Sequence, residues 1–346
     1  MMTRPVKLAV LGAGLIGKRH IQHVLTEPSA QLSAVVDPTP VGETIAKEVG
    51  VKWFTSFAQM IAADRPDGII VATPNQAHVQ NGLEAVEAGI PALIEKPIAD
   101  NIISGEKLIA AAEAKGVPLL TGHHRRHNPM MRKAKEIIES GKLGRVLVVN
   151  AMFWLFKPDD YFDISWRRER GAGPVFLNLI HDVDNLRYLF GDVVAVQARE
   201  SNAVRGNAVE ETAVILIEFK NGVLGTATVS DSVVAPWSWE MTTGENPAYP
   251  RTEQSCYMIG GTHGSLAVPA LEVWRNPGKR SWWEPLDQMR IEVDAEDPLV
   301  LQIRQFCKVI RGEEPPLVSG REGLETLRVI DAVKRSAATG ERIELK

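Results

Sequence analysis

The fold of this chain is decided by residues 6–17, which read VKLAVLGAGLIG. An apolar run of strand length leads into glycines with the spacing GxGxxG, and a helical pattern follows them. Glycines at these positions permit a tight turn, leave room for a pyrophosphate, and let the helix lie close to the strand. The free N–H groups of that helix would point at the phosphates. The pattern predicts a dinucleotide-binding turn with cofactor contacts at Gly12, Gly14, Leu15, Ile16 and Gly17.

An acidic residue stands 20 positions beyond Gly17. Asp37 directly follows the apolar run 32–36, at the expected tip of a second strand. A carboxylate there can accept hydrogen bonds from both ribose hydroxyls of adenosine but repels a 2′-phosphate, so we expect NAD rather than NADP. Two alternatives stay open. The glycine turn could bind nothing, or Asp37 could only cap a helix that starts near Val41.

The composition is that of an ordinary globular protein, with 346 residues, 45% hydrophobic and 24% charged. The 39 basic and 43 acidic residues give a net charge of −4, without a basic run suited to nucleic acid or an anionic membrane. Apolar runs are only of strand length and residues 1–5 lack a signal-peptide core, so we expect a cytoplasmic protein with neither of those partners. Cys256 and Cys307 lack metal-ligand spacing, which favours reduced thiols and no metal site.

Strand and helix patterns alternate up to about residue 121, which is typical of a parallel sheet with crossover helices. The expected strands are 6–11, 32–36, 52–54, 68–72, 91–94 and 117–121, and the expected helices are 15–26, 40–49, 75–88 and 103–115. The fold class is therefore α/β, with a Rossmann domain over 1–122. Ligands of such sheets bind beyond the carboxyl ends of the strands, so residues that follow a strand are the site candidates.

Strand patterns dominate from residue 123 onward. Helical 130–140 precedes a strand over 145–156, and after a helix over 173–190 the expected strands are 193–202, 209–219, 222–230, 237–243, 254–260, 265–268, 271–275 and 289–293. Tight turns such as 220–222 favour a large, mostly antiparallel open sheet in an α+β domain over 123–346. Helices are expected at 297–311 and 321–338. The stretch 236–254 is loop-like and is expected to shape substrate access.

Two candidate segments directly follow expected strands. TPNQAH, residues 73–78, comes after the strand 68–72, and Glu95-Lys96-Pro97 comes after the strand 91–94. The first segment could be only a helix start capped by Asn75. A lysine on a loop is usually solvated, but Pro97 restricts Lys96 to extended backbone geometry, which favours a functional role.

In the order and spacing of these motifs the chain resembles the Gfo/Idh/MocA family of glucose–fructose oxidoreductase and inositol dehydrogenase. GHHRRHNP at 122–129, SGKLG at 140–144 and WR at 166–167 extend the resemblance over roughly the first 190 residues. The resemblance implies NAD-dependent chemistry, an often cis Lys–Pro bond, and a homodimer or homotetramer in which a second subunit covers the open sheet. It also implies cofactor contacts by Thr73, Pro74, Asn75, His78, Glu95 and Lys96.

The helical pattern at 173–190 has an apolar stripe and a polar stripe, and His181 lies on the polar one. Such a stripe is usually only the wet face of a helix, but the resemblance implies that His181 is the general base and that Lys96 hydrogen-bonds the same substrate oxygen. Many family members carry a polar residue four positions before the histidine, where this chain has Leu177. In this chain the role of that polar residue, which is to orient the histidine, would pass to Asn178 or Asp182. The candidate substrate contacts are Arg126, Trp154, Tyr161, Arg167, Asn178, His181 and Asp182.

The leading interpretation is an NAD-dependent oxidoreductase that transfers a hydride between a secondary alcohol and nicotinamide. The resemblance implies that the substrate is a small sugar, polyol or cyclic hydroxy compound. The family also includes regulators that bind the dinucleotide without turnover, and glycosidases that use NAD transiently. The presence of both Lys96 and His181 argues for an enzyme, whereas Leu177 keeps the other classes open.

Overall fold

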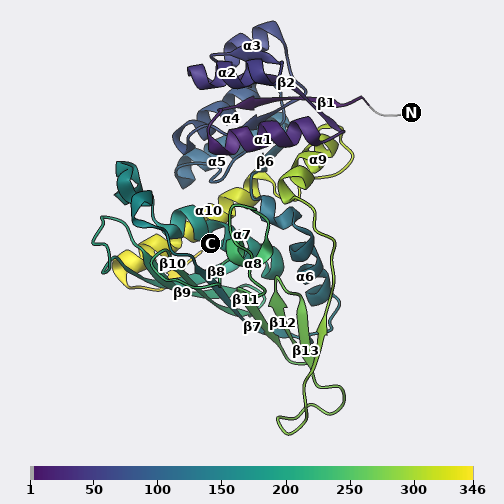
Figure 1. Cartoon of the computed structure of the whole chain (residues 1–346), viewed down its shortest axis with the longest axis vertical. Helices are drawn as coiled ribbons and strands as arrows, with labels where there is room; N and C mark the ends of the chain where they lie inside the picture. The colour runs from purple at the N-terminus through teal and green to yellow at the C-terminus, as the bar shows by residue number, and fades with distance from the viewer. Residues whose placement is uncertain (1–3, 346) are drawn as a thin grey trace. The chain divides into compact units, whose positions relative to one another are not determined.

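The computed structural model describes residues 4–345, which form two compact units (Figure 1). One unit contains the residues up to His127 together with Glu296–Leu327, and the other contains Asn128–Ala295 and the residues from Arg328 on. The expected single boundary at 122/123 differs from this division, because the chain returns to the first unit near its end. No helix within residues 4–345 has both the length and the apolar character that spanning a membrane requires.

The first unit is built on a six-stranded sheet with the order β3-β2-β1-β4-β5-β6, in which all neighbours are parallel. This order reverses between β1 and β4, and ligands of such sheets bind at that point. The central strands are buried on both faces, which explains their continuous apolar runs. The strands are β1 (Val6–Leu11), β2 (Ala30–Val36), β3 (Lys52–Phe54), β4 (Gly68–Val71), β5 (Ala92–Ile94) and β6 (Leu119–Thr121).

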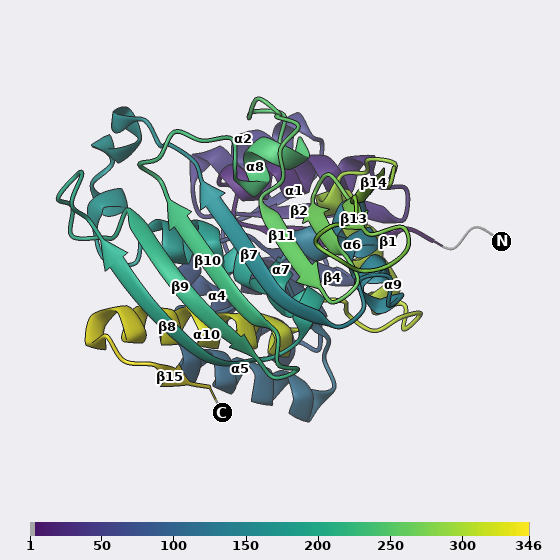
Figure 2. The same ribbon diagram turned by 90° about the horizontal axis from the view of Figure 1, so that it is seen from below.

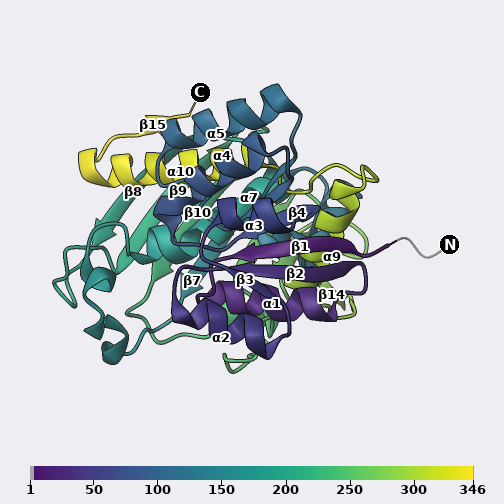
Figure 3. The ribbon, with the colours of Figure 1, turned by 90° about the horizontal axis from the view of Figure 1, so that it is seen from above.

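The crossover helices lie on both faces of this sheet, as expected for right-handed connections. Figure 3 shows α1 and α2 on one side of β1 and β2, and α4 and α5 on the other. The helices are α1 (Leu15–Thr26), α2 (Pro40–Glu48), α3 (Phe57–Ala63), α4 (His78–Glu87) and α5 (Ile102–Lys115). α3, a seven-residue helix whose first turn is capped by Ser56, was not predicted from the sequence.

A helix from near the end of the chain completes the core of the first unit. α9 (Pro298–Ile310) contributes Phe306 and Cys307 to the cluster that contains Leu8 and Val10 of β1. The fit is close at Gly68, where an added Cβ would lie 2.5 Å from the Ile310 side chain. The first sheet therefore needs residues from beyond 297 to bury one of its faces.

The second unit is built on a nine-stranded sheet with the order β14-β13-β12-β11-β7-β10-β9-β8-β15, and only its β7–β10 pair is parallel. Figure 2 shows β8, β9, β10, β7 and β11 in this arrangement. The strands are β7 (Val146–Trp154), β8 (Val193–Ser201), β9 (Thr212–Phe219), β10 (Leu224–Ser230), β11 (Tyr257–Gly261), β12 (Ser265–Val268), β13 (Glu272–Arg275), β14 (Asp287–Arg290) and β15 (Ile343–Glu344).

The helices of the second unit include one that the sequence analysis assigned wrongly. The expected strand 237–243 is the helix α8 (Trp239–Thr243), because the Ser238 side chain accepts a hydrogen bond from the backbone N–H of Met241 and caps it. The other helices are α6 (Pro129–Glu139), α7 (Ile180–Phe190) and the part of α10 (Gly320–Thr339) from Arg328 on.

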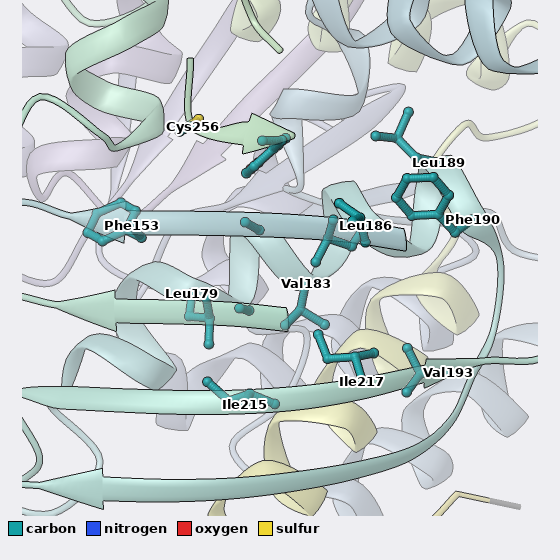
Figure 4. Packing of buried hydrophobic residues seen from close by; sticks show 14 of the residues in the cluster. Phe153, Leu179, Val183, Leu186, Leu189, Phe190, Val193, Ile215, Ile217 and Cys256 are labelled. Atoms are coloured by element: carbon teal, nitrogen blue, oxygen red, sulfur yellow. The ribbon is translucent and has the colours of Figure 1, made fainter. Parts of the chain in front are cut away.

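One face of the nine-stranded sheet forms the core of the second unit. Figure 4 shows Leu179, Val183 and Leu186 packed against the sheet residues Phe153 and Ile217. Residues that alternate with the buried ones point to the opposite face, where several apolar side chains remain more than 40% exposed. These exposed side chains are Val148, Val214, Leu216, Leu224 and Met258, which we call the open face.

Candidate active site

The glycine turn lies at the carboxyl end of β1 and has the geometry that the sequence predicts. Gly12 has a φ of +91°, and a Cβ there would lie 2.5 Å from the Ala72 carbonyl oxygen. A Cβ on Gly17 would lie 2.0 Å from the Gly12 carbonyl oxygen, whereas Gly14 has nothing within 4 Å of that position. α1 begins at Leu15 without a side-chain cap. The space above Gly14 and the uncapped helix N-terminus fit a pyrophosphate.

Asp37 is tied to the same turn. Its Oδ2 accepts a hydrogen bond of 2.7 Å from the backbone N–H of Ala13, and its Oδ1 accepts one of 2.8 Å from the N–H of Thr39. Thr39, rather than Asp37, is the N-cap residue of α2, so the capping alternative does not hold. Oδ1 accepts a further hydrogen bond of 2.5 Å from the Thr39 hydroxyl. Each carboxylate oxygen can accept about two hydrogen bonds, so Oδ2 keeps an acceptor position for a ribose hydroxyl.

The segment 73–78 forms a short 3-10 helix, η1 (Asn75–Ala77), that continues into α4. No side chain caps either helix, so Asn75 is not the cap that the alternative required. His78 is buried, and its Nδ1 lies 2.7 Å from the Pro97 carbonyl oxygen while its Nε2 lies 2.9 Å from that of Thr73. The imidazole predicted to contact the cofactor therefore joins two loops inside the first unit.

Glu95 and Lys96 follow β5 at the same edge of the sheet. Glu95 is buried, and its carboxylate lies 2.7 Å from His20 Nε2. Burial raises the pKa of Glu95, but the hydrogen bond and charge of His20, with the charges of His124 and Lys96, outweigh it and hold the pKa at about 2. The ionised Glu95 carboxylate, paired with His20, therefore stabilises the fold at neutral pH, and this stabilisation is lost as the pH falls towards 2.

Lys96 is half-buried, and its peptide bond to Pro97 is cis, as the resemblance implied. Arg126, a predicted substrate contact, is buried. It lies in the interior of the first unit on η2 (His124–His127), where its guanidinium pairs with Glu322 at 3.0 Å. The ion pair with Glu322 compensates the burial of the guanidinium, and the substrate contact expected of Arg126 stays a prediction.

In the second unit, the helix predicted over 173–190 has two parts. A π-helical turn, η5 (Val175–Leu179), leads into α7. Glu210 accepts a hydrogen bond of 3.1 Å from the backbone N–H of Val175, and a Cβ on Gly173 would overlap its carboxylate. His181 lies in the first turn of α7 with 8% of its surface exposed. The π-helical turn places an irregular backbone just before the predicted base.

The two residues expected to replace an orienting side chain at position 177 have different surroundings. Asp182 is buried and accepts a hydrogen bond from the Tyr257 hydroxyl, which in turn accepts one of 3.0 Å from Asn185. Asn178 accepts a hydrogen bond of 2.9 Å from Lys157 Nζ. Asp182 therefore belongs to a buried hydrogen-bond network, and its substrate contact stays a prediction.

Sequence reasoning missed Lys157 and Asp231. Lys157 follows β7 and Asp231 follows β10, and because these strands are parallel their carboxyl ends meet. Lys157 Nζ lies 3.3 Å from the Asp231 carboxylate, which Arg205 also contacts. Burial lowers the pKa of Lys157, although Asp231 opposes the shift. The rule applied to the first sheet would have found this pair, but the second sheet was expected to be mostly antiparallel.

Three further predicted substrate residues surround this pair or its strands. The Arg167 guanidinium lies 4.0 Å from the centre of the Tyr161 ring, and Lys157 Nζ lies 5.1 Å from the same ring. Trp154 donates a hydrogen bond of 2.9 Å to Thr228 across β7 and β10. The structure thus brings Tyr161, Arg167 and Asn178 together around Lys157. Within the described part of the chain, no group of three histidine, cysteine, aspartate or glutamate side chains could hold a metal ion.

Two family models match the chain. The model described as "Oxidoreductase family, NAD-binding Rossmann fold" matches residues 6–123, and "GFO/IDH/MocA C-terminal domain" matches residues 131–267. The 1,5-anhydro-D-fructose reductase of Ensifer adhaerens is 24% identical over 97% of this chain and 98% of its own. The scyllo-inositol 2-dehydrogenase (NAD(+)) of Bacillus subtilis is 24% identical over 99% of this chain and 97% of its own.

Among solved structures, the WlbA dehydrogenase from Bordetella pertussis, in complex with NADH and UDP-GlcNAcA, is similar over 99% of each chain, with a TM-score of 0.80 and 26% identity. The two family models match one part of the sequence each, and the six-stranded parallel sheet and the large second sheet agree with these two matches. The chain therefore belongs to the Gfo/Idh/MocA family of oxidoreductases and has an NAD-binding Rossmann domain.

Proposed function

We propose that this chain is an NAD-dependent oxidoreductase that transfers a hydride between a secondary alcohol of a sugar, polyol or cyclic hydroxy compound and nicotinamide. The observation that carries the proposal is the position of Lys96, which follows β5 at the sheet edge where the glycine turn follows β1. Relatives named for sugar and inositol substrates support the substrate class.

The residues of the first unit fit the dinucleotide. Gly14 and the N-terminus of α1 would hold the pyrophosphate, and Asp37 would accept the adenosine ribose hydroxyls. Bound NAD supplies a hydride acceptor at the nicotinamide ring. Thr73, Pro74 and Asn75 stand at the end of β4 next to β1, so they remain our proposed cofactor contacts.

Side chains of the protein accept the hydroxyl proton of the alcohol and stabilise the negative charge that develops on its oxygen. The His181 imidazole takes the hydroxyl proton of the alcohol, and the Lys96 ammonium group donates a hydrogen bond to the same oxygen. In the reverse direction His181 returns the proton. Asn178, which accepts a hydrogen bond from Lys157, is the polar group that we propose for orienting the His181 imidazole, because the Leu177 side chain cannot form a hydrogen bond.

The direct test is reduction of NAD, followed by absorbance, across a panel of inositols, polyols, aldoses and sugar acids. Turnover with at least one member supports the proposal. Leu177 favours one competing function, a regulator that binds the dinucleotide without turnover. Tight NAD binding in a titration, with no turnover of any panel member in either direction, would favour the regulator instead.

Replacing Asp37 by alanine is expected to narrow the preference for NAD over NADP. The carboxylate repels a 2′-phosphate, and one unfavourable contact of this kind is worth about 1–3 kcal/mol, or roughly tenfold to a hundredfold in affinity. Titration of both cofactors against wild type and Asp37→Ala measures the change. Glu43→Ala, which removes an exposed carboxylate from α2, is the matched control. Equal binding of both cofactors by the wild type would contradict the assignment.

We also propose a homodimer or homotetramer that buries the open face. An exposed apolar sheet face of this kind is typical of an association surface. Light scattering at micromolar concentration should give the mass of a dimer or tetramer, and Leu216→Arg should shift it towards the monomer. Leu25→Arg changes an exposed leucine of α1 and should leave the mass unchanged. A monomeric wild type would rule the proposal out.

A further inference from the structure

The Glu95 carboxylate is enclosed by residues of the first unit. Its Oε1 lies 2.7 Å from His20 Nε2, and its Oε2 accepts a hydrogen bond of 3.1 Å from the backbone N–H of Lys96. A Cβ on Gly122 would lie 2.9 Å from its carboxyl atoms. The first residue after β5 is therefore fixed by contacts on several sides, and one of these contacts is with Lys96 itself.

His20 connects this carboxylate to the helix of the glycine turn. It lies on α1, is fully buried, and among residues 4–345 its Nδ1 has no hydrogen-bond partner. The hydrogen bonding of its ring is therefore directed to Glu95. A buried carboxylate is costly unless it is paired, so this pair couples the position of α1 to that of the loop that carries Lys96.

A second histidine holds the other end of this loop. The Pro97 carbonyl oxygen lies 2.7 Å from Nδ1 of His78, and the Nε2 of that ring lies 2.9 Å from the Thr73 carbonyl oxygen. Lys96 thus stands between two anchored residues. Glu95 is held through a charged carboxylate, whereas Pro97 is held through a neutral carbonyl group.

The charges around Glu95 define its effect on Lys96. The groups that face the carboxylate are His20 from α1, His124 from η2 and Lys96 from its own loop. Since Coulomb attraction is mutual, the anion that Lys96 stabilises also stabilises the Lys96 ammonium group. Loss of this anion would make the lysine give up its proton at lower pH.

We propose that His20 and Glu95 are positioning residues for Lys96: the pair fixes its backbone, and the carboxylate keeps its ammonium group charged for donation to the substrate oxygen. The proposal rests on the proposed function, in which Lys96 contacts that oxygen. It assigns to Glu95 a role inside the protein in place of the cofactor contact that the resemblance implied.

The test measures the titration of Lys96 directly, in the full-length protein without substrate. Lysines are dimethylated with ¹³C-formaldehyde, and the Lys96 signal is identified by its absence in Lys96→Arg. Glu95→Gln should lower the midpoint of the Lys96 titration, because an opposite charge near the ammonium group is lost. Glu87→Gln removes an exposed carboxylate of α4 and should leave the midpoint in place. An unchanged midpoint in Glu95→Gln would overturn the proposal.

Glu95→Gln disrupts the buried pair with His20 and could destabilise the fold, so a second variant replaces both residues of the pair. His20→Gln combined with Glu95→Gln retains an amide hydrogen bond without the charge, and the same fall in midpoint is expected. With any substrate that turns over, Glu95→Gln should also lower kcat by about tenfold or more and shift the basic limb of kcat/KM to lower pH. If no substrate turns over, the proposed function fails, whereas the midpoint still decides this inference.

Discussion

Lys96→Ala is expected to lower kcat by about 10²-fold or more while NAD affinity changes little. Removing a donor aimed at developing negative charge typically costs this much in rate. Steady-state kinetics with a substrate from the panel, together with NAD titration, measure both quantities. Lys115→Ala, which removes a lysine from an exposed ion pair of α5, is the matched control and should retain wild-type kcat.

His181→Ala should lower kcat to a similar extent, because the alcohol would lose its proton acceptor. Since both side chains are proposed to act on one oxygen, the double variant should be far less impaired than the product of the two single effects. His263→Ala changes an exposed histidine of the same unit and should have no effect. Wild-type kcat in either single variant, or fully multiplicative losses, would contradict the shared role.

Phe306→Ala is expected to lower the free energy of unfolding of the first unit by about 3–5 kcal/mol, since it removes a fully buried aromatic ring. Native-state hydrogen exchange of the β1 amides reports on this unit by itself. Trp282→Ala, at a position that is 89% exposed, should change the stability by less than about 0.5 kcal/mol. A loss below about 1 kcal/mol in Phe306→Ala would mean that α9 contributes little to the core.

The first sheet could be predicted closely because its signals are local. The glycine turn, the continuous apolar runs and the glycines that end helices each act within a few residues, and the predicted strands of residues 6–121 agree with β1–β6 to within about two residues. The α/β fold class, with a Rossmann domain and a large second sheet, is confirmed. The strand assigned to 237–243 was wrong because one serine cap outweighed the β-propensity of two tryptophans.

The parts of the site that could not be predicted depend on distant partners. Arg126 and Asp182 were polar residues beside functional motifs, but Glu322 and Tyr257 draw them into the interior. The strand-end rule was not applied to Lys157, because nothing local indicates that β7 and β10 are parallel neighbours. Pairings between segments far apart in sequence fix these side chains, and a single sequence does not encode them locally.

The late position of α9 has a consequence for synthesis on the ribosome. The strands of the first sheet emerge by Thr121, but Phe306 follows only after β7–β14 of the second sheet have been made. At about 5–20 residues per second, one apolar face of the nascent sheet stays uncovered for roughly ten to forty seconds. We expect holding chaperones to bind during this interval, and chains that terminate before Pro298 to keep that face exposed and to be degraded.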